Sequence, residues 1–132
     1  MSDLSGNREQ NANMINSIFS VIDIKLEETS ELQRQLLATF AFGMVYADGK
    51  IKGLSPVEVH GLVISMLQSV FNYSADQSGE FSSLLIKSAS DKSVHSIIHA
   101  VIHRGIKGHY QWKKKHCYLL KENIEEIFDE VK

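Results

Sequence analysis

The sequence is poor in cysteine, proline and tryptophan. The scarcity of cysteine excludes some kinds of cross-link and metal site, and the position of the proline indicates where a helix begins. The chain's 132 residues include one cysteine, one proline and one tryptophan. Because Cys117 has no second cysteine to pair with, we expect no internal disulfide and no multi-cysteine metal site, which suits a reducing compartment. The single proline, Pro56, follows a serine at the first position of an expected helix, where proline is well tolerated.

Long apolar segments are also missing. No apolar run reaches about 18 residues, the length that predicts a membrane-spanning helix. The opening segment, MSDLSGNREQNAN, is polar throughout and lacks the apolar region and cleavage site of a secretory signal peptide. We therefore expect a cytoplasmic protein that makes no contact with a membrane.

Charge of neither sign dominates, but the charges are unevenly distributed. The formal net charge of −2 argues against generic nucleic-acid binding. Residues 104–116 hold five lysines or arginines and no acid, whereas residues 121–132 hold five acids and two lysines. Residues 23–31 are also acidic, with four acids and one lysine. These patches predict a directional electrostatic field across the surface, unless they pair with each other.

Apolar residues at helical spacing are abundant. With 43% apolar and 23% charged residues, the chain is large enough for one globular domain with a sizeable core. No stretch alternates convincingly between apolar and polar residues, so the predicted fold class is all-α, a single compact domain of about six helices joined by short loops. We expect a disordered or frayed N-terminus at residues 1–10 and one helical domain at residues 11–132. The expected helices span residues 9–26, 31–48, 56–72, 75–87, 94–105 and 109–132.

The second expected helix is the best candidate for the centre of the core. Its second half, LLATFAFGMVYA, is crowded with apolar and small residues. Gly43 in this segment costs about 1 kcal/mol relative to alanine, and close approach of a neighbouring helix explains that cost. Asp48-Gly49 is expected to end the helix, with Gly53 at positive φ in the following loop. Three serines with Gln or Glu three residues later predict capping boxes at helix starts: Ser30 with Gln33, Ser55 with Glu58, and Ser74 with Gln77.

His95, His99 and His103 recur every four residues in the segment VHSIIHAVIHRGIKGHYQW. On a helix this spacing stacks them along one flank, where two imidazoles can share a transition-metal ion. All three cannot bind one ion, because they span about 12 Å of helical rise. A site on this helix also needs a ligand from another element, for which the candidates are Glu58, His60, His109 and His116. We favour contacts with neighbours, solvent or a partner, and expect no metal and no cofactor.

Two further motifs partly resemble binding sites, one for calcium and one for single-stranded nucleic acid, but each lacks features that such a site needs. The turn around Asp48-Gly49 resembles the start of a calcium loop, but it lacks the later acidic ligands, and Val59 stands where the bidentate glutamate is needed. A turn that ends a helix is the preferred interpretation. The basic segment at residues 104–115 includes Tyr110 and Trp112, a mixture found in single-strand nucleic-acid binders. No recognised nucleic-acid motif surrounds it, so we favour a solvated helix face, with Trp112 packing at the domain edge.

Catalysis has no support in the sequence. Cys117 and His116 are adjacent, and neighbouring residues on a helix point about 100° apart, so they do not form a nucleophile–base pair. No phosphate-binding glycine loop, paired-carboxylate pattern or nucleophile elbow is present. We therefore expect that the protein is not an enzyme.

Two resemblances to known families go beyond these patterns. The segment FAFGMVYADGKIKGLSPVEVHGLVISML (residues 40–67) resembles the helix–loop–helix core of tellurite-resistance TerB-like domains. That resemblance implies a metal- or ligand-binding helical module, and it covers about a fifth of the chain.

A wider pattern extends from about Ile15 onward. It combines an FG on the second helix, the helix start GLSPVEVH, FNYSADQSGEF, and IIHRGIKGHYQW. Together these resemble an all-helical family of bacterial polymorphic-toxin immunity proteins, the family numbered forty-eight. The matching positions are Phe42, Gly43, His60, Tyr73, Phe81, His103, Arg104, Gly105, His109, Gln111 and Trp112. Phe42, Gly43 and Phe81 are expected in the core.

This second resemblance implies a protein without chemistry of its own, which binds a cognate toxin domain in the producing cell and blocks it. Two surfaces are candidates for the contact. The preferred one would fill an acidic cleft of the toxin, since arginine and tryptophan are frequent interface anchors; its residues are His99, His103, Arg104, Lys107, His109, Gln111 and Trp112. The second would mimic nucleic acid before a basic nuclease, and its residues are Glu27, Glu28, Glu31, Glu125, Glu126 and Asp129. Homodimerisation is compatible with the sequence.

Overall fold

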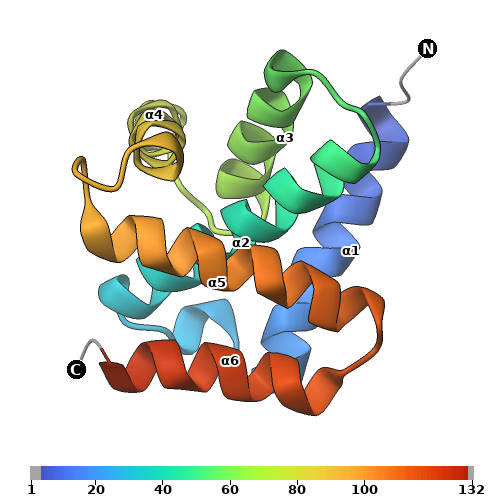
Figure 1. The fold of residues 1–132 in the computed structure, drawn as a ribbon, viewed down its shortest axis with the longest axis vertical. Coiled ribbons are helices and arrows are strands. Elements are labelled where there is room, and N and C mark those ends of the chain that lie inside the picture. Colours follow the sequence, from blue (N-terminus) through green and yellow to red (C-terminus); the bar gives the residue numbers. More distant parts are fainter. Residues whose placement is uncertain (1–3, 131–132) are drawn as a thin grey trace.

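Apolar residues at helical spacing and serine caps produce a chain of helices in the computed structural model, which describes residues 4–130. Within this part of the chain, six α-helices and no strand form one compact unit (Figure 1), so the predicted fold class is confirmed. The helices are α1 (Leu4–Ile22), α2 (Glu31–Ile51), α3 (Pro56–Ser69), α4 (Ala75–Ser90), α5 (Ser96–Lys113) and α6 (Cys117–Glu130), and a short 3₁₀ helix, η1 (Leu26–Glu28), precedes α2.

All three predicted capping boxes are present. In each, the serine oxygen accepts a hydrogen bond from the backbone N–H three residues later, over 3.1 to 3.2 Å. The Gln or Glu side chain returns to the serine N–H at 3.0 Å. Because the first N–H groups of a helix have no partner within it, these contacts define where α2, α3 and α4 begin.

The first helix begins earlier than the composition suggests. Residues 4–10, expected to be frayed, lie in α1, whereas residues 1–3 of that expected segment lie outside the described residues. Near the start of α1, Gln10 accepts a 2.8 Å hydrogen bond from Lys52, the C-cap residue of α2, and Asn11 is 5% exposed. The opening turns of α1 are thus attached to the rest of the molecule.

The predicted end of the second helix is wrong by about one turn. α2 passes through Asp48 and Gly49 and ends at Ile51. Gly49 is buried, and a Cβ there would press on the side chain of Val59 at 2.8 Å, so the glycine serves packing rather than helix termination. Gly53 does have a positive φ of 72°, as predicted for the loop that follows.

The predicted end of the histidine helix at Gly105 is also wrong. α5 continues through Gly105 and Gly108 to Lys113, because these glycines make room for α2. A Cβ on Gly43 would overlap the carbonyl oxygen of Ile102, and a Cβ on Gly105 would overlap that of Phe40. The close approach inferred for Gly43 is therefore confirmed, and α5 supplies the neighbour.

Helix α2 forms the centre of the core, as predicted. Every residue from 36 to 45 is buried, and α2 packs most extensively against α5. The two helices run in the same general direction, since their first turns line one groove and Asp48 contacts His109 near their far ends. In Figure 1, α5 crosses the front of the molecule with α6 alongside it. One face of α5 is therefore left uncovered.

A helix that spans a membrane needs about 20 consecutive, predominantly apolar residues. Within residues 4–130, no helix combines the length and the apolar character needed to cross a bilayer.

Candidate functional site

Helix α5 has an inner face and an outer face with different compositions. The inner face packs on α2 and includes Val101, Ile102 and Gly105, all buried. On the outer face, exposed residues recur every three or four positions, which aligns them on one side of a helix. They are Ala100, His103, Lys107, Tyr110 and Lys114, and we call this row the α5 stripe. Since Lys114 is the C-cap of α5, the stripe runs from the second turn of the helix to its C-terminal end.

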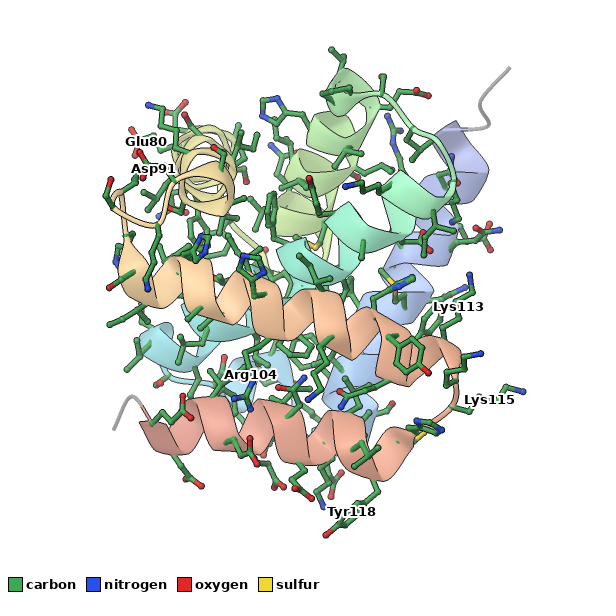
Figure 2. The ribbon with its side chains drawn as sticks, in the orientation of Figure 1. Glu80, Asp91, Arg104, Lys113, Lys115 and Tyr118 are labelled. Carbon is green, nitrogen blue, oxygen red and sulfur yellow. The ribbon has the colours of Figure 1, made fainter. Side chains whose placement is uncertain are left out.

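The stripe becomes aromatic and basic toward its C-terminal end. Tyr110 is 58% exposed, and the Lys114 ammonium lies 5.8 Å from the centre of its ring. Lys113 and Lys115 flank Lys114 and extend from the end of α5 and the turn after it (Figure 2). Within residues 4–130, neither Lys107 nor the three lysines at 113–115 form an ion pair. Their charge is available to attract an acidic surface.

His109 does not belong to this exposed surface, contrary to expectation. It is 2% exposed, and its Nε2 lies 3.0 Å from Oδ1 of Asp48. Lys52 lies 2.7 Å from the other oxygen of that carboxylate. Burial raises the pKa of Asp48, but the hydrogen bonds from His109 and Lys52 outweigh it and hold the pKa below its usual value. This cluster joins α2 to α5 inside the molecule.

Gln111 is also buried, at 6% exposure, and belongs to a network with Arg104 that joins α5 to α6. The centre of the network is Asn123 of α6, whose side-chain amide donates to Gln111 Oε1 at 3.1 Å and to the Arg104 carbonyl at 3.0 Å. In return, Nε of Arg104 donates to Asn123 Oδ1 at 2.6 Å. Figure 2 shows Arg104 between α5 and α6, where Glu126 also accepts from its guanidinium at 2.6 Å.

The remaining members of the preferred set differ in accessibility. Trp112 is partly buried against the core, with its ring 6.1 Å from that of His109, consistent with the expected packing role. His99 is half-buried, and its Nδ1 lies 2.8 Å from the carbonyl oxygen of Ser88. His103, whose ring lies 4.5 Å from that of His99, and Lys107 are exposed. Of the predicted residues, these two lie fully on the surface.

The three periodic histidines have three separate structural roles. His95 caps α5, since its Nδ1 accepts the N–H of Ile98 at 3.2 Å. His99 packs against α4 through the Ser88 carbonyl, and His103 lies on the surface. In the part of the chain that the structure describes, no group of three or more His, Cys, Asp or Glu residues is arranged to hold a metal ion.

The second predicted set is divided between two regions. Glu27 and Glu28 belong to η1, and Glu31 begins α2. Several carboxylates of this set already have partners within the chain. Glu28 accepts a hydrogen bond from the Lys25 N–H at 2.8 Å, and Glu31 forms an ion pair with Arg34 at 3.0 Å. On α6, Glu126 pairs with Arg104, Asp129 also interacts within the chain, and Glu125 is exposed.

Sequence reasoning missed one residue of the exposed α5 stripe and one residue of the buried α5–α6 network. Tyr110 was noted only as part of the basic segment, although it lies three residues after Lys107 and thus on the same helix face. Asn123 was not singled out, although it is a polar residue within the apolar pattern of Leu120, Ile124 and Ile127. A polar residue at a core position is the signal for a buried network.

Comparison with known proteins gives one positive result. The model of the family described as Immunity protein 48 matches the chain over residues 7–132. No match was found among the curated proteins or the solved structures. The predicted family is therefore confirmed, and the resemblance to TerB-like domains stays a prediction.

Proposed function

Since the chain belongs to the immunity protein 48 family, we propose that it binds a cognate bacterial toxin domain in the cytoplasm of the producing cell and neutralises it by occupying its surface. The family match over residues 7–132 is the observation on which this proposal rests. In this role the protein needs a stable exposed surface rather than reactive groups. It acts without catalysis of its own and without a metal or cofactor.

We place the toxin contact on the α5 stripe. This differs from the set derived from sequence, because His109 and Gln111 are buried and Arg104 is engaged with Asn123 and Glu126. His103 and Lys107 remain from that set, and Tyr110 and Lys114 join them. Exposed tyrosine on a rigid helix supports this choice, because tyrosine supplies a large contact area and loses little conformational entropy on binding.

The charge of the stripe specifies the kind of toxin surface it fits. Lys107 and the lysines at 113–115 form no ion pair within residues 4–130. An acidic cleft or patch on the toxin would pair with them. Such complementarity speeds association and makes it dependent on salt. Arg104 and its network would hold α5 against α6, so that the stripe is presented in a fixed geometry.

The proposal predicts that a toxin domain is encoded beside the gene for this protein, and co-expression with that domain tests the function. We expect the protein to protect the host cell from that toxin. We also expect the two purified proteins to form a complex of fixed stoichiometry. An unrelated toxin of another family serves as the control and should remain toxic. If the cells are not protected and no complex forms at micromolar concentration, the proposal is wrong.

Charge reversal separates the two candidate surfaces. Lys107→Glu should weaken toxin binding and reduce the association rate, whereas Glu125→Lys and Glu27→Lys should leave both unchanged. If Glu125→Lys and Glu27→Lys weaken binding and Lys107→Glu does not, the toxin contact lies on the acidic set on η1, α2 and α6 instead. Each of the three residues is exposed, so the substitutions should leave the fold intact.

A further inference from the structure

A groove of about 640 Å³ lies where the first turns of α2 and α5 meet α4. Its lining is mainly apolar and includes Leu32, Leu36, Phe81, Leu84, Ile97 and Ile98. Two of these side chains remain open to solvent, since Leu32 is 50% exposed and Ile97 is 52% exposed. A mainly apolar groove with exposed apolar side chains at its edge can receive an apolar side chain of another protein.

Tyr73 contributes an unsatisfied polar group to the groove. It is a lining residue, 8% exposed, and its buried hydroxyl has no partner of good hydrogen-bond geometry within the described residues, although the Arg34 guanidinium is close enough to interact with it. The ring is fixed in place by Phe81, with ring centres 5.6 Å apart, and by the Arg34 guanidinium 4.0 Å above it. A buried hydroxyl without a partner is costly, and a ligand with a hydrogen-bonding group at this position would remove that cost.

The polar rim of the groove favours a cationic occupant. Glu31 and Glu80 both line it. Glu31 is already paired with Arg34. The side-chain carboxylate of Glu80, on α4, makes no hydrogen bond or ion pair within residues 4–130. Figure 2 shows Glu80 extending outward from α4. A lysine or arginine of a partner can pair with this carboxylate.

We propose that the groove receives a segment of the cognate toxin that carries an apolar side chain next to a lysine or arginine. The inference rests on the proposed function and deepens it by adding a second contact of opposite charge. The groove adjoins the α5 stripe, because Ile97 lines the groove and lies one turn before Ala100 on the same helix. One toxin domain can therefore cover both, with acidic groups at the stripe and a basic group at the groove.

Aspartate substitutions at the groove test the apolar contact. The probe is the purified toxin domain encoded beside the gene for this protein, titrated against each variant by calorimetry. Ile97→Asp and Leu32→Asp should each weaken binding at least about 10-fold, as expected for apolar residues near the centre of an interface. Ile51→Asp and Val57→Asp are matched controls, since these side chains are 63% and 81% exposed and lie outside the groove. The controls should bind within about twofold of the unaltered protein.

Two more variants test the polar contacts. Tyr73→Phe removes a hydroxyl that has no well-aligned hydrogen-bond partner in the free protein, so the thermal stability of the variant should be unchanged or higher, while its toxin affinity should fall about two- to tenfold. A purely structural role for Tyr73 would lower stability without a separate loss of affinity. Glu80→Lys should also weaken binding and should slow association, and Glu9→Lys, at an exposed position of α1, is its matched control.

The outcomes distinguish this inference from the proposed function. If the groove variants and their controls bind toxin equally while Lys107→Glu binds more weakly, the groove inference is wrong and the immunity function stands. If the unaltered protein does not bind the toxin, the proposed function fails first. If Ile97→Asp instead dissociates a dimer of the free protein without changing toxin affinity, a second copy of the chain is the occupant and the inference is again wrong.

Discussion

At the residue scale, the best-connected polar groups inside this protein have partners on other helices. Asp48 is the clearest case, because its carboxylate lies at the meeting point of α2 and α5 with His109 on one oxygen and Lys52 on the other. Lys52 in turn donates to Gln10 of α1. His109 and Gln111, two members of the preferred set predicted to contact the toxin, are used in this way to hold helices together.

Substitution of Asp48 should reveal a pH-dependent contribution to stability. The pKa of Asp48 in the folded protein lies below its usual value of 3.8, so the ionised carboxylate stabilises the fold above that value. The stabilisation is lost as the pH falls through the lowered pKa. Asp48→Asn should therefore reduce the free energy of unfolding by about 2 kcal/mol at pH 7, and the difference from the unaltered protein should shrink at pH 3.

Urea denaturation at the two pH values measures this difference. Glu122→Gln, at an exposed position of α6, is the control and should change the free energy of unfolding by less than about 0.5 kcal/mol at either pH. An Asp48→Asn difference that stays constant between pH 7 and pH 3 would contradict the role assigned to the ionised carboxylate.

At the element scale, glycine sets the distance between the two central helices. Gly43 of α2 and Gly105 of α5 face each other, with each Cα about 3 Å from the position of a Cβ on the other. Gly108 of α5 makes room for the ring of Phe40. Helices that approach this closely bury the apolar face of α5 along α2, and this packing keeps α5 helical through two glycines.

Alanine substitution distinguishes packing glycines from surface glycines. Gly105→Ala should lower the free energy of unfolding by at least about 2 kcal/mol, because the added methyl group meets the backbone of Phe40 and the helices must separate. Gly61→Ala is the matched control on α3, where nothing lies within 4 Å of an added Cβ, and it should stabilise the protein by up to about 1 kcal/mol. Thermal unfolding of both variants gives the comparison, and a neutral Gly105→Ala would exclude the glycine contact as a determinant of the fold.

The elements show which features could be predicted from sequence. Capping boxes and apolar spacing are local, so the starts of α2, α3 and α4 and the central place of α2 were predicted correctly. The ends of α2 and α5 were not, because a glycine that ends a helix and a glycine that admits a neighbour look alike until the neighbour is known. The candidate site could not be predicted for the same reason, because the sequence does not show how the helices pack. Whether Arg104 and His109 are exposed depends on where α6 and α2 lie against α5.

At the scale of the whole molecule, the surface combines regions of opposite character around one rigid helix. In the part of the chain that the structure describes, the lysines of the α5 stripe form no ion pair, the groove at the start of α5 has a carboxylate rim, and the second acidic set is largely paired. A partner that covers both the stripe and the groove needs a matching arrangement of charge, which other toxins would lack. Under the proposed function, this pattern rather than any single residue would set the specificity for one toxin.

The most direct test of this account compares two exposed tyrosines. Tyr110 lies on the α5 stripe and is 58% exposed, whereas Tyr118 lies on α6, is 76% exposed and projects from another part of the surface (Figure 2). The affinity for the toxin domain encoded beside the gene should fall at least about 10-fold in Tyr110→Ala and stay within about twofold of the original in Tyr118→Ala. Equal affinity in the two variants, or a loss confined to Tyr118→Ala, would contradict the assignment of the α5 stripe as the surface that binds the toxin.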